Sequence, residues 1–246
     1  MNLLLLDPAE LDQGEGVTLS GRRAEHLLRV LKVEAGDTVR VGVIGSMLGR
    51  GRVTAVAGET VRLAVDLERE PVCDFHIELI LALPRPIMLQ RILKQATVLG
   101  VRRFHLIRSR RVEKSFFHSP VLAPAKIRAL LLEGMEQAMD TWLPEVILHH
   151  QFKPFVEDVV PTLAGQGVIA HPGADGSMAE LSLGSRSGQR VLLAVGPEGG
   201  WSDYELGQFS DRGFHGFTMG SRILHVDTAV VSLLAQLQLL YDLRKR

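Results

Sequence analysis

Beyond Pro71 the chain alternates apolar runs with amphipathic stretches, and this alternation limits the possible folds more than any other feature. The runs with the character of strands are FHIELILAL, RRFHLIRS, VILHH, GVIAHPGAD and RVLLAVG. The stretches with the character of helices are IMLQRILKQATVLG, PAKIRALLLEGMEQAMD and an apolar segment near 227–243. Strands rich in Val, Ile and Leu that alternate with helices are typical of a mostly parallel sheet covered on both faces. We therefore predict an α/β domain over residues 72–246.

The first seventy residues follow a different pattern. DTVRVGVI, GRVTAV and ETVRLAV alternate apolar with polar residues and are separated by turns. This is the period-two pattern of half-buried strands. RRAEHLLRVLKV, which precedes them, predicts a short amphipathic helix that ends near Gly36. The sequence thus predicts a small β-barrel or sheet domain over residues 1–71, with the boundary near residues 70–74.

Composition excludes several classes of protein. Cys73 is the only cysteine, so the chain forms no internal disulfide and no thiolate metal cluster. The first residues, MNLLLLDPAE, lack the charged start, long apolar region and cleavage site of a signal peptide, and we expect a soluble, cytoplasmic protein without a membrane segment. His149 and His150 should point to opposite faces of a strand with no acid or thiol partner nearby, so we expect no metal.

Positive charge is unevenly distributed although the formal net charge is zero. Arginines and lysines gather between Arg85 and Lys114, opposed only by Glu113. Such a field attracts a nucleic-acid backbone by counterion release. The alternative is a solvated helix face and loop, which is what most charge runs are.

The most specific local signal is the loop that follows the run VLLAVG. A continuous apolar run is expected of a central strand, and Gly196 ends it where the backbone needs freedom. Pro197 stiffens the exit, and the glycine pair 199–200 lets main-chain groups approach a ligand. Ser202 and Glu205 form a capping-box pattern, which predicts a helix that ends before the glycine at 213. Ligands bind at the carboxyl ends of such strands, although a tight turn without a ligand remains an alternative.

A second run, MGSRILHVDTAVV at 219–231, has the same construction. A strand, HGFTM, is followed by a turn at Gly220 and an apolar helix for which Asp227 or Thr228 is the expected N-cap. Two such turns form a pocket walled by main chain, suited to a flat heterocycle. Neither run contains the G-x-G-x-x-G or Walker sequence, which disfavours a dinucleotide or a nucleoside triphosphate.

The two runs together resemble a known family. GPEGGWSDYE followed by MGSRILHVDTA is similar to the paired signature of the RsmE-type 16S ribosomal RNA uridine-N3 methyltransferases of the SPOUT superfamily, roughly G-P-E-G-G-x-S-x-x-E and L-G-x-R-I-L-R-x-E-T-A. HLLRVLKVEAGDTV, LKQATVLGVRR, EGMEQAMDTWLPEV and IAHPGAD resemble further family segments in the same order. The resemblance therefore covers essentially the whole chain.

The resemblance implies both a fold and an activity. The fold is a SPOUT trefoil-knotted α/β methyltransferase domain preceded by a PUA-like β-barrel that binds RNA. The activity is S-adenosylmethionine-dependent methyl transfer to N3 of a uridine in the ribosomal RNA of the small subunit, by a homodimer without a metal. Two alternatives stay open: a divergent SPOUT methyltransferase with another RNA target, and a non-catalytic RNA-binding ribosome assembly factor that keeps the pocket.

The matched positions imply a set of site residues. The residues expected to bind the cofactor are His171, Pro172, Val195, Gly196, Pro197, Glu198, Gly199, Met219, Gly220, Ser221, Ile223, Leu224, Thr228 and Ala229. The residues expected to act in catalysis are His225 and Asp227. The residues expected to bind RNA are Arg22, Arg23, Arg29, Arg108, Arg110 and Arg111.

Several charged positions depart from the family pattern. His225 stands in place of the arginine of R-I-L-R, Asp227 in place of the glutamate of E-T-A, and Val98 in place of the glutamate of T-E-L-G. Arg110 replaces a glutamate and Asp140 replaces an arginine, which suggests a reversed ion pair between them across the dimer or the pocket rim.

Three side chains of the two runs have alternative interpretations. His225 serves as a general base or packs as a helix-end histidine, because an imidazole carries little charge at pH 7. Asp227 orients His225 or caps the helix. Trp201 stacks on a flipped base or acts as a structural lid.

Overall fold

The computed structural model describes residues 2–11, 16–71, 75–181 and 188–244. The chain forms two compact units. The first consists of Met1–Val72 and Leu132–Leu143, and the second consists of Cys73–Leu131 and Pro144–Arg246. The expected boundary near residues 70–74, with Cys73, falls largely outside the described residues and stays a prediction.

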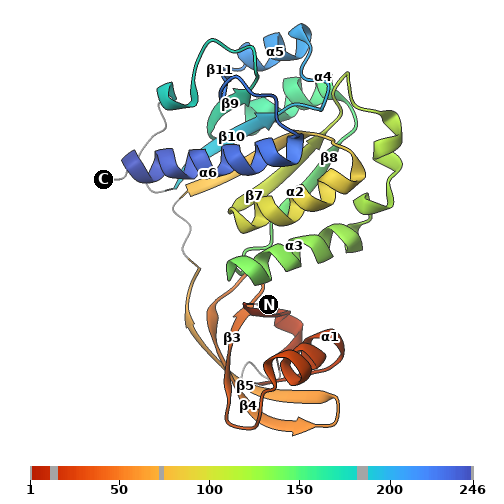
Figure 1. The fold of residues 1–246 in the computed structure, drawn as a ribbon, viewed down its shortest axis with the longest axis vertical. Coiled ribbons are helices and arrows are strands. Elements are labelled where there is room, and N and C mark those ends of the chain that lie inside the picture. Colours follow the sequence, from red (N-terminus) through yellow and green to blue (C-terminus); the bar gives the residue numbers. More distant parts are fainter. Residues whose placement is uncertain (1, 12–15, 72–74, 182–187, 245–246) are drawn as a thin grey trace. The chain divides into compact units, whose positions relative to one another are not determined.

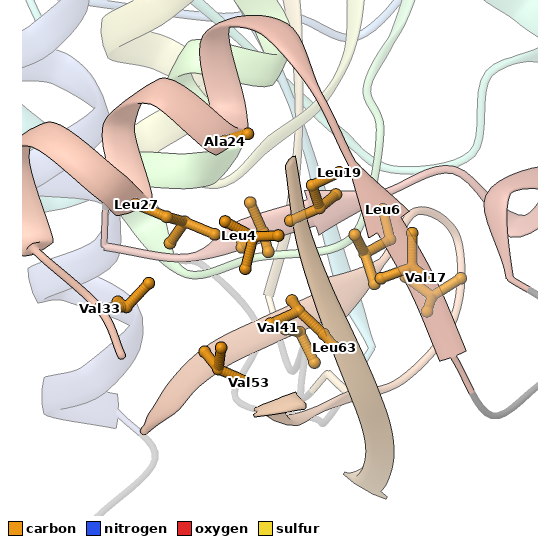
Figure 2. Close-up of a cluster of buried hydrophobic side chains, with 12 residues drawn as sticks. Leu4, Leu6, Val17, Leu19, Ala24, Leu27, Val33, Val41, Val53 and Leu63 are labelled. Carbon is orange, nitrogen blue, oxygen red and sulfur yellow. The ribbon is translucent and has the colours of Figure 1, made fainter. Parts of the chain in front are cut away.

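The first unit contains a five-stranded sheet of order β1-β3-β4-β5-β2 (Figure 1). Its strands are β1 (Leu4–Leu6), β2 (Gly16–Leu19), β3 (Thr38–Val43), β4 (Leu48–Ala57) and β5 (Thr60–Arg69). β1 pairs with β3 in parallel, and the remaining pairs are antiparallel. The strands predicted from the period-two pattern are therefore confirmed. Inward-facing apolar side chains form the core, and Figure 2 shows Leu4, Leu6, Val41 and Leu63 gathered in it.

The helical segment before β3 ends earlier than the sequence suggested. α1 (Gly21–Glu25) continues as a π-helical stretch, His26–Leu31, and the chain then turns at Lys32, whose φ is 53°. A left-handed residue at this position terminates a helix, so the expected end near Gly36 is wrong. Leu27 packs into the core, whereas Val30 is 64% exposed.

The segment Leu132–Leu143 packs with the first unit although it lies far away in sequence. It includes the end of α3 (Pro124–Ala138). Met135 is buried in a second apolar cluster with Leu3, Leu5 and Leu48. The amphipathic pattern of α3 indicated a helix, but it did not indicate which unit its last turns would join.

The second unit contains a six-stranded sheet of order β11-β9-β10-β6-β7-β8. Its strands are β6 (Phe75–Ala82), β7 (Val101–Ile107), β8 (Glu145–His149), β9 (Gln166–Ala170), β10 (Gln189–Val195) and β11 (His215–Phe217). All of their pairings are parallel, so the predicted parallel sheet is confirmed. The chain visits β6, β7 and β8, returns to β9, and then inserts β10 between β9 and β6. The carboxyl ends of β9, β10 and β11 are thereby brought together.

Helices α2 (Pro86–Val98) and α6 (Val226–Arg244) lie against each other on one face of this sheet (Figure 1). By length and composition α6 could cross a membrane; Val230, Leu233 and Leu237 are buried, whereas Leu239 and Leu243 are each 57% exposed. The expectation that Asp227 or Thr228 is the N-cap is wrong, because α6 already begins at Val226.

The shorter elements of the chain are α4 (Phe152–Pro154), α5 (Asp203–Ser210), Phe155–Val159 as a π-helix, and 3-10 turns at Pro8–Glu10, Lys114–His118, Pro120–Leu122, Val160–Thr162 and Met178–Glu180.

Candidate active site

A cavity of about 140 Å³ lies where β9, β10 and β11 end and α6 begins. Its walls come from the loops after these strands, as expected for an open parallel sheet. The residues predicted to bind the cofactor that line it are His171, Pro172, Val195, Gly196, Pro197, Glu198, Met219, Gly220, Ile223, Leu224 and Ala229. Gly200 and Trp201, which the sequence had singled out in the same loop, line it as well. The lining residues that were not anticipated are Ala170, Phe217, Thr218, Arg222, Val226 and Leu233. The three remaining candidates, Gly199, Ser221 and Thr228, lie outside this lining.

Trp201 is a fixed wall of the cavity. Its side chain is 4% exposed and packs edge-on against Phe209, with ring centroids 5.4 Å apart. A Cβ atom at Gly196 would lie 3.0 Å from the indole Nε1, so the absence of a side chain there lets the indole pack on the backbone. Of the two interpretations of Trp201, the structure favours the structural lid, because a buried ring has no free face on which a flipped base could stack.

Two polar atoms in the lining residues have no hydrogen-bond partner among the residues that the structure describes. They are Nε1 of Trp201 and Nδ1 of His171. Buried polar atoms without a partner are uncommon in proteins. Both atoms belong to residues of the cavity wall, and unpartnered polar atoms there fit a cofactor that carries a polar heterocycle.

The loop after β10 is held in place by Arg111. The guanidinium Nη1 donates to the carbonyl oxygens of Gly199 at 2.5 Å and of Trp201 at 3.3 Å. A Cβ atom at Gly199 would lie 3.2 Å from Cδ of Arg111. The side chain of Arg111 thus occupies the space beside Gly199. From the sequence we had expected a ligand to approach the main chain there.

The helix after this loop begins as predicted. Ser202 and Glu205 form the capping box at the start of α5, which ends before Gly213. Glu205 is 1% exposed, and its second oxygen accepts a hydrogen bond of 2.7 Å from the backbone amide of Arg110. Glu205 therefore ties the exit of β7 to the loop after β10.

The two expected catalytic residues, His225 and Asp227, lie at the start of α6 and are not among the residues that line the cavity. Asp227 lies in the first turn, where Oδ2 is 3.3 Å from Arg91 Nη1 and Oδ1 accepts from the Thr228 amide at 3.0 Å. His225 is exposed, and its carbonyl oxygen accepts the Ala229 amide at 2.8 Å. Within the described ranges no hydrogen bond joins the two side chains, so the structure gives no support to Asp227 as the group that orients His225.

Residues 71–238 match the family described as the RNA methyltransferase domain. Over 241 residues the chain is 31% identical to the ribosomal RNA small subunit methyltransferase E of Treponema pallidum (strain Nichols), an alignment that covers 96% of this chain and 90% of that protein. The chain belongs to the ribosomal RNA small subunit methyltransferase E family. The predicted family is therefore confirmed.

The chain is also similar to a second relative of the same name and to a solved structure. The protein of the same name from Synechocystis sp. (strain ATCC 27184 / PCC 6803 / Kazusa) is 28% identical over 92% of this chain and 74% of its own length. The crystal structure of the Neisseria gonorrhoeae ribosomal RNA small subunit methyltransferase E bound to S-adenosyl methionine is 21% identical and superposes with a TM-score of 0.79 over 98% of both chains. At that identity the superposition shows a shared fold.

The departures from the family pattern lie in different parts of the structure. Arg110 belongs to the second unit and Asp140 to the first, so the reversed ion pair stays a prediction. Oδ1 of Asp140 accepts the backbone amide of Trp142 at 2.9 Å. Val98 is the last residue of α2 and is 39% exposed.

The arginines expected to bind RNA differ in whether their side chains already form ion pairs or hydrogen bonds within the protein. Arg23 forms an ion pair with Glu10, whose hydrogen bond raises the pKa of the guanidinium, and Arg111 holds the loop after β10. Arg29 forms an exposed, weak ion pair with Glu25, and the exposed Arg22 pairs with the buried Glu136. Within the described part of the chain, the guanidinium groups of Arg108 and Arg110 have no partner.

A chain of polar side chains connects β6, β7 and the edge strand β8 and was not anticipated from the sequence. Glu78 Oε2 lies 3.3 Å from His105 Nε2, and His105 Nδ1 lies 3.1 Å from His149 Nε2. Burial alone would raise the pKa of Glu78, but the hydrogen bond from His105 and the charge of Arg103 hold it below its usual value. Burial and the rings of His105 and His150 lower the pKa of His149 to about 4.

This polar chain is not a metal site in the described structure, because no group of three or more His, Cys, Asp or Glu side chains in the described ranges could hold an ion. Sequence reasoning placed no acid near His149, since Glu78 lies on a strand far away in the sequence. Strand order alone brings β6, β7 and β8 together.

Proposed function

We propose that the protein is an S-adenosylmethionine-dependent methyltransferase that modifies N3 of a uridine in the 16S ribosomal RNA of the small subunit. The observation that carries this proposal is the cavity walled by the loops after β9, β10 and β11, with two unpartnered buried polar atoms. It is supported by the relatives, which are named as methyltransferases of small-subunit ribosomal RNA, and by the S-adenosyl methionine bound to the relative from Neisseria gonorrhoeae.

Main-chain groups and buried side chains of this chain would hold the cofactor. The loop from Gly196 to Trp201 and the loop from Thr218 to Leu224 would enclose it, with His171 and Trp201 binding its heterocycle through their unpartnered atoms. The bound cofactor supplies an electrophilic methyl group on a sulfonium. The buried indole of Trp201 forms one wall of the cavity and would exclude water on that side of the group.

The reaction requires removal of the uridine N3 proton as the methyl group arrives. We propose His225 for this step, because its exposed imidazole at the start of α6 is adjacent to lining residues of the cavity. Asp227 is proposed to position the start of α6 through Arg91 and the Thr228 amide, which makes its contribution indirect. Arg222, also in the lining, adds positive charge where negative charge develops on the uracil.

The finer features of the family are proposed for this chain as well. They are a trefoil knot in the second unit, a PUA-like RNA-binding domain of residues 1–71 followed by a methyltransferase domain of residues 72–246, a homodimer, no metal and a cytoplasmic location. The five-stranded sheet of the first unit and the parallel sheet of the second are compatible with this organisation.

The test is methyl transfer from labelled S-adenosylmethionine to small ribosomal subunits purified from cells that lack the protein. We expect N3-methyluridine to appear in the 16S ribosomal RNA when nucleosides are separated by mass spectrometry. Subunits that already carry the modification serve as the control and should stay unlabelled. A protein that binds the cofactor but labels other RNA would be a divergent methyltransferase, and one that labels no RNA would be an assembly factor.

A further inference from the structure

A second hollow, of about 410 Å³, lies at the carboxyl ends of β7 and β8 and shares no lining residue with the cavity. It is lined by the segment 108–110 after β7, the segment 150–154 after β8, and Ser202, Tyr204 and Glu205 around the start of α5. Its volume is many times the roughly 10–15 Å³ that a cavity needs to hold one water molecule, so it admits a much larger ligand.

The charge of the hollow favours an anion. Arg108, Arg110 and Lys153 contribute positive charge to its lining. The guanidinium groups of the two arginines have no partner in the described ranges, and Lys153 makes only a long contact of 3.8 Å with Glu157. Glu205, the one acid in the lining, is buried and bonded to Ser202 and to the Arg110 amide. The positive charge is therefore not neutralised within the hollow.

The hollow also offers an aromatic surface, and one of its lining residues carries a buried hydroxyl. Tyr204 is 53% exposed, and Phe152 supports its ring from 6.2 Å at an angle of 60°. Phe152 is in turn packed edge-on against Phe209. An exposed ring held by other rings is a surface on which a nucleobase stacks. Ser109 lines the same hollow, is 3% exposed, and has an Oγ without a partner in the described structure.

We propose that this second hollow binds one nucleotide of single-stranded RNA next to the nucleotide that is methylated. Arg108, Arg110 and Lys153 contact its phosphate, and its base stacks on Tyr204. This inference rests on the proposed function, because it concerns how the same RNA substrate is held.

The position of the hollow relative to the cavity agrees with this assignment. All strands of the sheet are parallel, so both sites lie at the same edge. β6 alone separates β10 from β7, which corresponds to about 10 Å at the usual strand spacing. Glu205 and Arg111 connect the loop after β7 to the loop after β10, so the two sites keep a defined separation. A neighbouring nucleotide reaches the hollow while the target base meets the cofactor held in the cavity.

The test measures binding of a fluorescein-labelled single-stranded decauridylate to the full-length protein in the presence of S-adenosylmethionine. We expect Tyr204→Ala to weaken binding about tenfold and Tyr204→Phe to bind like the unmodified protein, because stacking needs only the ring. Tyr204→Leu keeps an apolar contact with Phe152 but lacks the ring, and it should bind as weakly as Tyr204→Ala. Cofactor affinity, measured by calorimetry, should not change.

The arginines are tested by the salt dependence of the same binding. Arg108→Ala and Arg110→Ala should each reduce the slope of log affinity against log salt by about one, as expected when one phosphate contact is lost. Lys126→Ala, which removes an exposed charge of α3 outside the hollow, is the matched control and should leave the slope unchanged.

The inference is overturned if the decauridylate does not bind, or if Tyr204→Ala, Tyr204→Leu and the arginine variants bind it like the unmodified protein. Methyl transfer to small subunits is scored separately. Normal transfer together with unaffected binding refutes the hollow and leaves the proposed function intact. Weakened binding in the variants, with no transfer by the unmodified protein, supports the hollow and refutes the proposed reaction.

Discussion

Gly196→Ala tests the cavity most directly, because the added methyl group would meet a buried ring. The new Cβ would lie 3.0 Å from Nε1, 3.1 Å from Cε2 and 3.2 Å from Cδ1 of Trp201. Favourable contacts between heavy atoms begin near 3.5 Å, so the indole must move by roughly 0.5 Å. Trp201 is 4% exposed and packs on Phe209, which leaves it little room. The φ of Gly196 is not in the left-handed region, so the penalty is steric.

Overpacking of this kind typically costs about 1–3 kcal/mol. We expect the free energy of unfolding to fall by about that amount and the affinity for S-adenosylmethionine to fall at least about tenfold, since 1.4 kcal/mol corresponds to a factor of ten. Isothermal titration calorimetry measures the affinity, and denaturant unfolding measures the stability. Gly207→Ala is the matched control, because Gly207 has no positive φ and its added methyl group would meet no heavy atom within 4 Å, so neither stability nor affinity should fall.

A second substitution separates the steric explanation from a general loss of structure. Trp201→Phe removes the nitrogen that lies nearest to the new methyl group. The double variant should therefore be more stable than the sum of the two single effects predicts, with a coupling of about 0.5–3 kcal/mol. Additive effects, or a Gly196→Ala variant that binds the cofactor normally, would refute the assignment of Trp201 as the wall that Gly196 accommodates.

Three further predictions concern other parts of the second unit. Arg111→Ala loses two hydrogen bonds to the loop after β10 and should weaken cofactor binding about three- to tenfold in calorimetry. Arg111→Lys should recover part of the loss. Normal affinity in the alanine variant would show that the arginine does not order the loop. The pKa of His149 is about 4 in the folded protein and 6.5 for the free group. Between these two pH values the unfolded chain therefore binds one more proton than the folded protein. The free energy of unfolding should fall as the pH decreases from 6.5 to 4. The free energy of unfolding should fall by about 1–2 kcal/mol, after allowance for solvent screening of this partly exposed ring. His149→Gln should abolish this pH dependence when denaturant midpoints are measured across the same pH range. An unchanged pH profile in the variant would contradict the pKa argument. His225→Arg removes the proposed base and should lower the rate of methyl transfer to small subunits about a hundredfold, whereas an unchanged or higher rate would show that the imidazole does not take the N3 proton.

The local features of this chain could be predicted because they depend on residues close together in sequence. The apolar run that ends at Gly196 identified β10, and the Ser202–Glu205 pair identified the start of α5. Period-two alternation identified β3, β4 and β5. Predictions about helix ends were less successful. The left-handed conformation of Lys32 stops the first helix early, and α6 begins one residue before the expected acidic cap.

Much of the site could also be predicted, since most residues that line the cavity come from two short runs and the His171–Pro172 loop. The missing members were the residues whose role depends on a distant partner. Arg111 looked like an RNA-binding residue of a basic run, yet it occupies the space beside Gly199. Glu78 and His149 showed no sign of belonging to one hydrogen-bonded chain.

The sequence by itself determined which segments form strands and helices, where the two glycine-containing loops interrupt them, and to which family the chain is similar. These properties follow from side-chain periodicity and backbone preferences, which act over a few residues. Only the tertiary structure decided that Leu132–Leu143 packs with the first unit, that Arg111 holds the loop beside the cavity, and that a second hollow forms at the ends of β7 and β8. Those contacts depend on strand order in the folded sheet, which no pattern of neighbouring residues encodes.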